Sequence, residues 1–191
     1  EAGNAIADVL FGDVNPSGKL TTSFPQSVGQ VPIYYAHKNT GRPLPEGKWF
    51  QKFRSNYLDV SNDPLYPFGY GLSYSNFSYS DLKLSSTSLK GNQLLTAKID
   101  ITNTSKVDGK EVVQLYIRDL VGSVTRPVKE LKGFSKFNLQ PGESKKVEFI
   151  LTDAELGFYN NNGEYIVEPG EFDVMIGTNS QQGISGNFTR K

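Results

Sequence analysis

From Phe77 onward the sequence is a series of short strand-like runs separated by turn residues, and this pattern restricts the possible folds more than any other feature. The clearest run, Leu94–Asn103, alternates apolar and polar side chains and so predicts a strand with one apolar face. Similar runs occupy Tyr79–Leu84, Glu111–Arg118, Lys129–Leu139, Lys145–Leu151 and Phe172–Gly177, and Phe188 lies in a last one. About seven short strands at such spacing are typical of an immunoglobulin-like or fibronectin-type sandwich.

Three further signals refine this prediction. The chain has no cysteine, so the Cys-Trp-Cys pattern of antibody domains is absent and the fibronectin type III-like variant is favoured. Thr152–Leu156 predicts a single helical turn with Thr152 or Asp153 as N-cap. Gln140–Glu143 contains Pro-Gly and predicts a type II turn between two strands.

The beginning of the chain has a different character. Glu1–Gly12 has apolar residues at helical spacing and ends in a glycine, which predicts a short helix with a C-terminal stop. Asn15–Gly18 predicts a turn, and Lys19–Phe24 a short strand. Because the sequence starts inside a helix, we expect it to be the C-terminal piece of something larger. The expected fold is mainly β: a fibronectin type III-like sandwich preceded by a short α/β remnant.

Between these parts, residues 37–62 show no sustained periodicity but contain several aromatic side chains. A loop this long is often functional. Aromatic faces stack on sugar rings and an arginine can hydrogen-bond hydroxyl groups, so four residues are substrate-proximal candidates: Trp49, Phe50, Arg54 and Tyr57. In the alternative interpretation, which we prefer, this stretch is a linker whose aromatic residues bury against a neighbouring domain.

The segment Tyr66–Tyr74 (YPFGYGLSY) lies where the helical and loop character ends and the strand pattern begins. It is too irregular for a simple helix or an alternating strand, and therefore predicts a packed junction. We place the boundary between a first unit, residues 1–75, and a sandwich, residues 76–191. The candidates for interdomain packing are Phe68, Tyr70, Tyr74 and, in a sandwich loop, Arg126.

Composition excludes several classes of function. Lys+Arg and Asp+Glu both number 20, so no basic surface for nucleic acid or an anionic membrane is expected. No apolar run approaches the roughly 20 residues of a membrane span. Without cysteine and with a single histidine, His37, neither a thiolate nucleophile nor a His-cluster metal site is available. No cofactor motif is present, and we predict neither cofactor nor metal.

Glycoside hydrolysis needs only two suitably spaced carboxylates. Outside the predicted sandwich, Glu46 and Asp59 flank the aromatic run, but nothing in their spacing makes them a pair. We expect His37 to hydrogen-bond loop backbone rather than to act as a base. No catalytic residue is therefore predicted in this chain.

Several motifs in consecutive order resemble glycoside hydrolase family 3. The segments Glu1–Asp13, Asn15–Leu20 and Phe24–Pro25 resemble the end of its α/β sandwich domain, and Tyr66–Tyr74 its exit signature. Val31–Tyr35 and His37–Pro43 look like its periplasmic β-glucosidase branch. The motifs of its C-terminal fibronectin type III-like domain are matched by Glu111–Tyr116, Arg126–Phe134, Leu139–Glu143 and Glu168–Phe172.

This resemblance implies a retaining enzyme that releases β-linked glucose from non-reducing ends. The family's nucleophile is an Asp in an N-terminal TIM-type barrel, and its usual acid/base is a Glu upstream in the α/β domain. Neither motif is present, so the chain is expected to be inactive alone and to have those missing domains as partners. The resemblance also implies a periplasmic or secreted location.

Three interpretations follow. The first is a structural, interdomain portion of a β-glucosidase, in which residues 38–57 shape the aglycone side. The second is a free-standing carbohydrate- or protein-binding module that uses the same loop. The third and weakest is a hydrolase complete in this chain.

Overall fold

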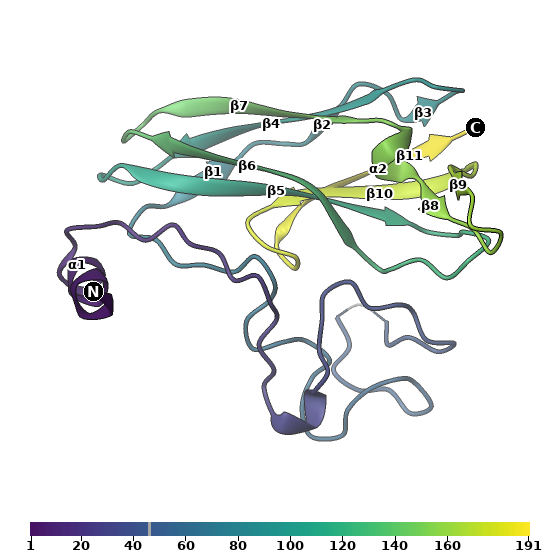
Figure 1. Cartoon of the computed structure of the whole chain (residues 1–191), viewed down its shortest axis with the longest axis horizontal. Coiled ribbons are helices and arrows are strands. Elements are labelled where there is room, and N and C mark those ends of the chain that lie inside the picture. Colours follow the sequence, from purple (N-terminus) through teal and green to yellow (C-terminus); the bar gives the residue numbers. More distant parts are fainter. Residues whose placement is uncertain (46) are drawn as a thin grey trace.

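The computed structural model describes residues 1–45 and 47–191 and shows a β-sandwich with a long, mostly irregular segment packed beneath it (Figure 1). Its helical elements are α1 (Ala2–Phe11), the 3-10 helix η1 (Val28–Gln30) and α2 (Asp153–Leu156). The strands are β1 (Phe77–Tyr79), β2 (Lys83–Leu84), β3 (Ser88–Leu89), β4 (Leu95–Asn103), β5 (Gly109–Asp119), β6 (Glu130–Leu139), β7 (Ser144–Leu151), β8 (Phe158–Tyr159), β9 (Tyr165–Ile166), β10 (Gly170–Gly177) and β11 (Gly183–Arg190).

Two sheets make up the sandwich. In the first sheet, β4 pairs along its length with β7, and β1 and β2 pair with separate halves of its other edge. The second sheet has the order β3-β11-β10-β5-β6 and is antiparallel except for the β3–β11 pair. A small hairpin, β8–β9, lies beside them. These features confirm the predicted fold class.

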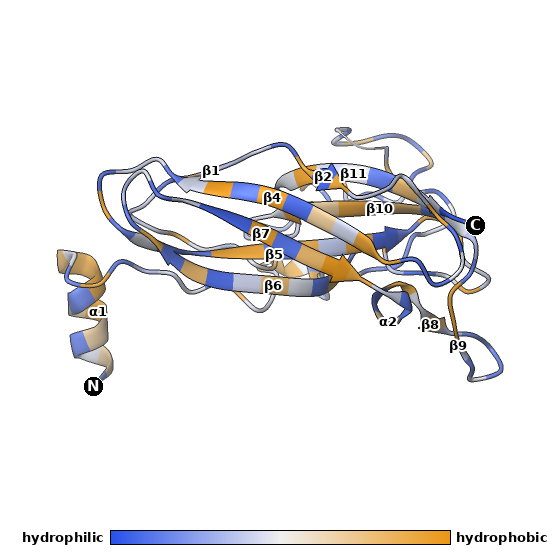
Figure 2. Cartoon of the chain, turned by 90° about the horizontal axis from the view of Figure 1, so that it is seen from above, coloured by the Kyte–Doolittle hydropathy of each residue, from blue (hydrophilic) through white to orange (hydrophobic). Residues whose placement is uncertain are grey.

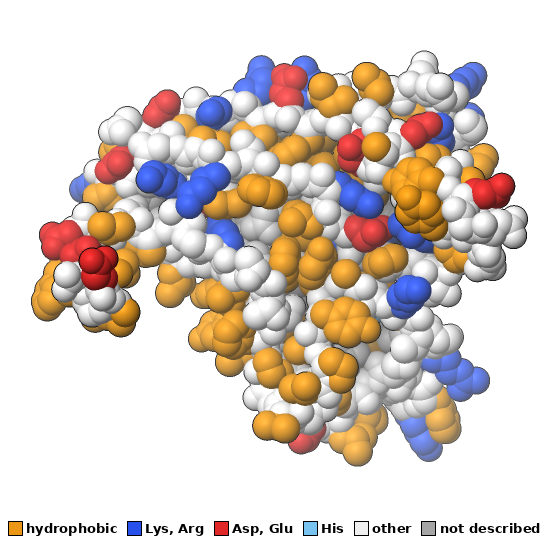
Figure 3. All heavy atoms as spheres, viewed as in Figure 1, with side chains coloured by type: hydrophobic (Ala, Val, Ile, Leu, Met, Phe, Trp, Pro, Cys, Tyr) orange, Lys and Arg blue, Asp and Glu red, His pale blue; other side chains and the backbone are white. Residues whose placement is uncertain are grey.

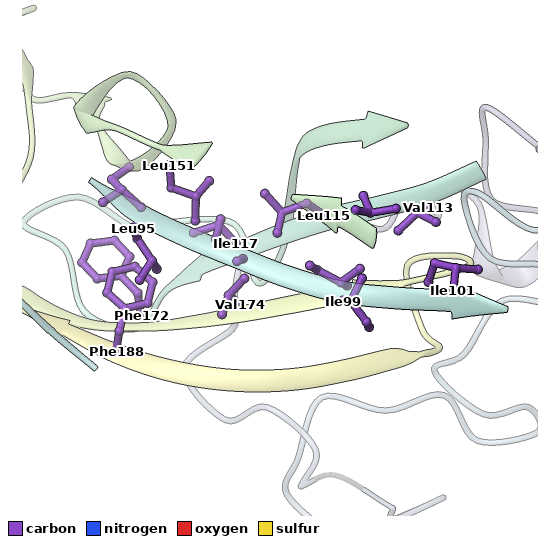
Figure 4. Close-up of a cluster of buried hydrophobic side chains, with 14 of the residues drawn as sticks. Leu95, Ile99, Ile101, Val113, Leu115, Ile117, Leu151, Phe172, Val174 and Phe188 are labelled. Atoms are coloured by element: carbon purple, nitrogen blue, oxygen red, sulfur yellow. The ribbon is translucent and has the colours of Figure 1, made fainter. Parts of the chain in front are cut away.

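The core forms because apolar residues alternate along the strands and face one another between the sheets. The alternation is visible along β4, β6 and β7 (Figure 2). In Figure 4, side chains from β4, β5 and β10 converge, and the rings of Phe172 and Phe188 stack with centroids 5.2 Å apart. The buried cluster comprises Leu89, Leu95, Ala97, Ile99, Ile101, Val113, Leu115, Ile117, Phe137, Leu139, Val147, Leu151, Leu156, Phe172, Val174, Ile176 and Phe188.

The local predictions within the sandwich hold at several points. Gly142 has a φ of 77° and Glu143 N donates to Gln140 O, so the predicted type II turn is present. Thr152 caps α2 with a full capping box. The run predicted at Tyr79–Leu84 is wrong as a single strand, because it divides into β1 and β2, which pair with separate halves of β4.

Residues 1–76 contain α1, η1 and no further helix or strand in the part that the structure describes. The helix prediction is confirmed: α1 ends where Gly12 adopts a left-handed φ of 87°. The strand predicted at Lys19–Phe24 is wrong, because only an isolated bridge, Phe24 to Tyr66, forms there. The turn predicted at Asn15–Gly18 is also wrong, because the Asn15 side chain is used for distant hydrogen bonds instead.

Candidate functional site

The junction segment Tyr66–Tyr74 lies against the second sheet, on the face turned away from the core. Gly69 O accepts a hydrogen bond from Gln114 Nε2 on β5, at 3.2 Å. Phe68 O accepts one from Ser180 N, at 2.9 Å. Because Gly69 has a φ of +81° and a Cβ there would lie 2.1 Å from Gln114 Oε1, only glycine fits this close approach.

The predicted packing residues of this segment have different neighbours. Phe68 stacks on Tyr35, with ring centroids 4.3 Å apart. Tyr70 packs beside Tyr66 at 5.0 Å. Tyr74 is half exposed, and its hydroxyl donates to Val9 O in α1. Packing against a further domain remains a prediction for all three.

Polar contacts from residues that the sequence did not single out also join the two regions. The Asn15 amide nitrogen donates to Ser75 Oγ and Asp108 O, both at 2.8 Å, and its Oδ1 accepts from Tyr74 N. Lys19 Nζ lies 3.3 Å from Glu111 Oε1, and the Glu111 side chain is only 5% exposed. Asn15 and Lys19 lie in a segment with turn and strand character, so no sequence signal revealed these long-range partners.

Glu111 also accepts a hydrogen bond from the Tyr79 hydroxyl at 3.1 Å. Burial, followed by the Glu111 charge and this hydrogen bond, raises the pKa of Tyr79 well above its usual range. Tyr79 therefore stays a neutral donor. The Lys19–Glu111–Tyr79 cluster ties residues 1–75 to both sheets at one end of the sandwich.

An open groove of about 960 Å³ lies between the 32–64 segment and the sandwich. Its first wall includes Tyr34, Trp49 and Tyr57, and its second includes Val128, Lys129, Ser180 and Gln181. Amide and hydroxyl groups line it as well, from Asn39, Thr40, Asn56, Ser61 and Asn62. Aromatic faces beside such hydrogen-bonding groups can bind a ring that has an apolar face and hydroxyl edges.

The four substrate-proximal candidates separate into two pairs. Trp49 is 56% exposed and, with Tyr57, lines the groove. Phe50 packs 6.2 Å from Trp49 but is outside the lining, and exposed Arg54 donates its backbone N–H to Gln51 O. No helix forms over residues 49–57. Phe53, which precedes Arg54, has a positive φ of 66°, and this backbone conformation is strained for a residue other than glycine.

Arg126 has its charged partners within the sandwich. Its guanidinium lies 2.6 Å from Glu130 and 3.9 Å from Asp119, and it packs over the Phe158 ring at 4.5 Å. Burial raises the pKa of Asp119 despite the opposing effect of Arg126. These contacts link β5, β6 and the β8–β9 hairpin, and contact of Arg126 with an upstream domain stays a prediction.

Those of the remaining candidates that the structure describes show no catalytic arrangement. His37 Nδ1 lies 3.3 Å from Lys38 O, so His37 contacts loop backbone, as expected. Of the two carboxylates considered, Asp59 is exposed and Glu46 lies outside the described residues. No cluster of three His, Asp or Glu residues suited to a metal occurs in residues 1–45 and 47–191. Neither α1 nor α2 is long and apolar enough to cross a membrane.

Known proteins match both regions. Residues 1–74 match the glycosyl hydrolase family 3 C-terminal domain, and residues 111–180 match a fibronectin type III-like domain. A periplasmic beta-glucosidase of Salmonella typhimurium is 53% identical over 98% of this chain, which is 24% of that protein. A beta-xylosidase of Formosa agariphila is 46% identical over 94% of this chain and 24% of its own length.

A solved structure agrees with these sequence matches. A beta-glucosidase from Listeria innocua, in complex with isofagomine, superimposes with a TM-score of 0.94 at 45% identity. The match covers 100% of this chain and 26% of that one. The chain thus spans about a quarter of the length of the relatives it matches. It belongs to glycoside hydrolase family 3, and contains that family's C-terminal domain followed by the fibronectin type III-like domain.

Proposed function

We propose that this chain is the C-terminal portion of a retaining β-glucosidase, and that it supports the catalytic domains rather than performing the chemistry. The observation that carries the proposal is that the chain matches beta-glucosidases along nearly its whole length. The match covers only about a quarter of the length of those proteins. In the longer enzyme, a double displacement through a glycosyl-enzyme intermediate would hydrolyse terminal β-glucosides. The two carboxylates that perform it would belong to the upstream domains.

The exposed apolar surface of residues 1–75 supports an upstream α/β domain and barrel as the partners. Ile6, Leu10 and Phe11 of α1 are 59%, 72% and 84% exposed. Figure 3 shows hydrophobic side chains gathered over the lower part of the molecule, where this region lies. Such a surface is unusual for a free soluble domain and marks an interaction site. We assign the division at residues 75 and 76, with Phe68, Tyr70 and Tyr74 packing at the interdomain junction.

Activity measurements test the proposal directly. The 191-residue chain is expected not to hydrolyse a chromogenic β-glucoside, whereas the longer polypeptide that contains it is expected to do so. A matched β-xyloside is the control for substrate, because a beta-xylosidase is also among the relatives. Turnover by the isolated chain, or a longer polypeptide that prefers the xyloside, would contradict the proposal.

Trp49 and Tyr57 are the best-placed substrate-proximal residues, because both line the groove, with Phe50 and Arg54 as outer neighbours. Trp49 is the single tryptophan, so its fluorescence reports on ligands in the groove. If the chain is instead a free-standing carbohydrate-binding module, cello-oligosaccharides should change this signal saturably. Tyr57→Ala should abolish that change, and Tyr159→Ala, at an exposed sandwich tyrosine, should leave it intact.

A periplasmic or secreted location is the last part of the proposal. It rests on the Salmonella typhimurium relative, whose name is periplasmic beta-glucosidase. Cell fractionation with an antibody against the sandwich tests it. Recovery of the protein with a cytoplasmic marker enzyme would contradict it.

A further inference from the structure

The outer face of the second sheet carries two buried groups whose positions are unusual. Along β5, Val113, Leu115 and Ile117 face the core, so Gln114 and Tyr116 point to the opposite side. An outer face normally meets water, yet Gln114 and Tyr116 are only 3% and 1% exposed. The segments that cover them must therefore be held close to the sheet.

An aromatic stack attaches the covering segments. The Tyr35 ring lies between Phe68, stacked at 4.3 Å, and Tyr116, edge-on at 5.8 Å. Tyr35 Oη also accepts a hydrogen bond from Leu131 N on β6, at 3.4 Å. Edge-on and offset-stacked rings of this kind contribute beyond the area that they bury.

A hydrogen-bond chain fixes the orientation of the stack. The Tyr116 hydroxyl donates to Gln114 Oε1 at 2.5 Å. The Gln114 amide nitrogen donates to Gly69 O and to Thr178 O, at 3.2 and 2.6 Å. Burial, and then the neighbouring Tyr35, raises the pKa of Tyr116, which keeps its hydroxyl protonated. Every polar atom of the Gln114 side chain is thus paired, so its amide has one favoured orientation.

The cluster adjoins the first groove wall, because Tyr35 itself lines the groove together with residues that follow it. Two residues beyond Tyr35, His37 O accepts a hydrogen bond from Val128 N at 2.8 Å, and Lys38 forms a bridge with Pro127. The chain then continues into the 39–64 stretch that carries Trp49 and Tyr57. At its far end, Gln181 Nε2 donates to Asp63 Oδ1, but this contact is exposed. The buried attachment to the sandwich is therefore at the Tyr35 end, since the buried Gln30 side chain that bonds Ser61 O and Asp63 O belongs to the first region itself.

We propose that Tyr116 and Gln114 are positioning residues that set the width of the groove by clamping Tyr35 and the junction segment to β5. They act through Tyr35, Phe68 and Gly69 and touch no reacting group themselves. The consequence for catalysis rests on the proposed function, in which the groove lies beside the substrate. The sandwich would then take part in substrate binding through Tyr116 and Gln114, which do not line the groove, as well as through its own residues in the groove wall.

The isolated chain provides the first test. Tyr116→Leu removes the ring and hydroxyl but keeps an apolar side chain, whereas Tyr116→Phe keeps the ring. Trypsin cleavage at Lys48, Lys52 and Arg54 reports opening of the exposed loop. We expect cleavage of Tyr116→Leu to be about tenfold faster, and acrylamide quenching of Trp49 to increase, because local opening follows lost buried contacts. Tyr116→Phe should fall between wild type and Tyr116→Leu, because it keeps the ring but leaves Gln114 Oε1 without its donor.

A matched control separates positioning from general stability. Val147→Ala removes buried volume in β7 of the first sheet and touches no residue of the clamp. It should lower the urea midpoint yet leave cleavage of the loop unchanged in native buffer. Should Tyr116→Leu fail to fold, Gln114→Leu removes the amide pairs and keeps the ring. Equal loop cleavage in the clamp variants and in Val147→Ala would overturn the inference.

The longer enzyme provides a second, separate readout. There, Tyr116→Leu should raise KM for a β-linked disaccharide about fivefold while kcat changes less than twofold, because binding rather than chemistry is affected. If that enzyme lacks β-glucosidase activity but its loop still opens in the variant, the proposed function fails and the clamp stands. If the enzyme is active and neither KM nor loop cleavage changes, the clamp fails and the proposed function stands.

Discussion

The two parts of the chain, residues 1–75 and residues 76–191, differ in how far their apolar side chains are buried. None of the buried hydrophobic side chains in the described part of the chain comes before Leu89, so the core belongs to the sandwich alone. Conversely, 16 of the 24 large hydrophobic side chains that are exposed there precede residue 75. In the part that the structure describes, the first region therefore has no core of its own and packs instead against the sheet.

The contacts that hold the first region combine an aromatic stack with specific polar pairs. Asn15, Gln114 and the Lys19–Glu111 pair each join groups that lie far apart in sequence. The Gln114 bond is buried, the Lys19–Glu111 pair is largely buried and the Asn15 bond is exposed, and such polar contacts fix geometry more than they add net stability. The sandwich thus supplies the stability of the folded chain, and residues 1–75 are held in position by their contacts with it. The predictions below test that separation, from the largest expected effect to the smallest.

The largest effect should come from the core. Leu115→Ala removes a side chain that is 1% exposed in the centre of β5 and should destabilise the chain by about 3 kcal/mol, through lost burial and a cavity. Leu58→Ala, at a site that is 80% exposed, should change the free energy of unfolding by less than about 0.5 kcal/mol. Urea denaturation measures both. A similar cost at both sites would show that the first region has a core after all.

The ion pair between the regions should have the next largest effect. Lys19→Met keeps the length of the side chain but leaves the buried Glu111 carboxylate with the Tyr79 hydroxyl and no cation at 3.3 Å. We expect a loss of about 1–3 kcal/mol in the free energy of unfolding.

Lys98→Met is the matched control for this ion pair. Lys98 lies 2.9 Å from Glu148, but both side chains are 44% exposed, so the loss should be below about 1 kcal/mol. A double-mutant cycle with Glu111→Gln isolates the coupling between the regions. A coupling energy near zero would mean that the Lys19 pair does not join them thermodynamically.

Alkaline pH should weaken the same junction gradually. The pKa of Tyr79 is raised in the folded state by burial and by Glu111, so its neutral form is preferred there. This contribution to stability is complete below the ordinary tyrosine pKa of about 10 and is lost as the pH rises above it. From pH 10 to pH 11 the fall should be about 1 kcal/mol. Tyr79→Phe should remove this part of the decrease in urea midpoint, and an unchanged pH profile would contradict it.

Most of the sandwich could be predicted from the sequence, because its strands, turns and caps are specified by residues that are close together in the chain. Strict alternation in Leu94–Asn103 gives β4 within one residue, and the Pro-Gly turn and the Thr152 cap require no distant partner. The two-residue strands β3, β8 and β9 were not predicted, because two residues are too few to show an alternating pattern. The register of such pairs is decided by tertiary contacts.

The candidate site was predictable only in part. Glycine and aromatic content identified Tyr66–Tyr74 as a junction, but Gln114 and Tyr116 resembled ordinary outward residues of an alternating strand. What distinguishes them is the covering by residues from positions 35 and 69, which no local pattern records. Trp49 and Tyr57 likewise reach one groove through an irregular loop, whereas Phe50 and Arg54, close in sequence, do not.

The smallest effect is expected at α1, where the comparison is most extreme. No residue of α1 is buried, and Figure 1 shows the helix standing apart from the sandwich. Leu10→Gln replaces one good helix former with another at a position that is 72% exposed. In the 191-residue chain, the free energy of unfolding should therefore change by less than about 0.5 kcal/mol.

The same substitution shows whether that surface is covered in the proposed longer enzyme. If the upstream α/β domain packs on α1, Leu10 is buried there, and Leu10→Gln should lower the thermal midpoint of the longer polypeptide measurably. Lys106→Gln, at an exposed site in the β4–β5 turn, is the control and should be neutral in both proteins. An equally small effect of Leu10→Gln in the longer polypeptide would mean that the exposed face of α1 is not where the upstream domain binds, and the apolar surface nearer Phe24 and Leu65 would become the remaining candidate.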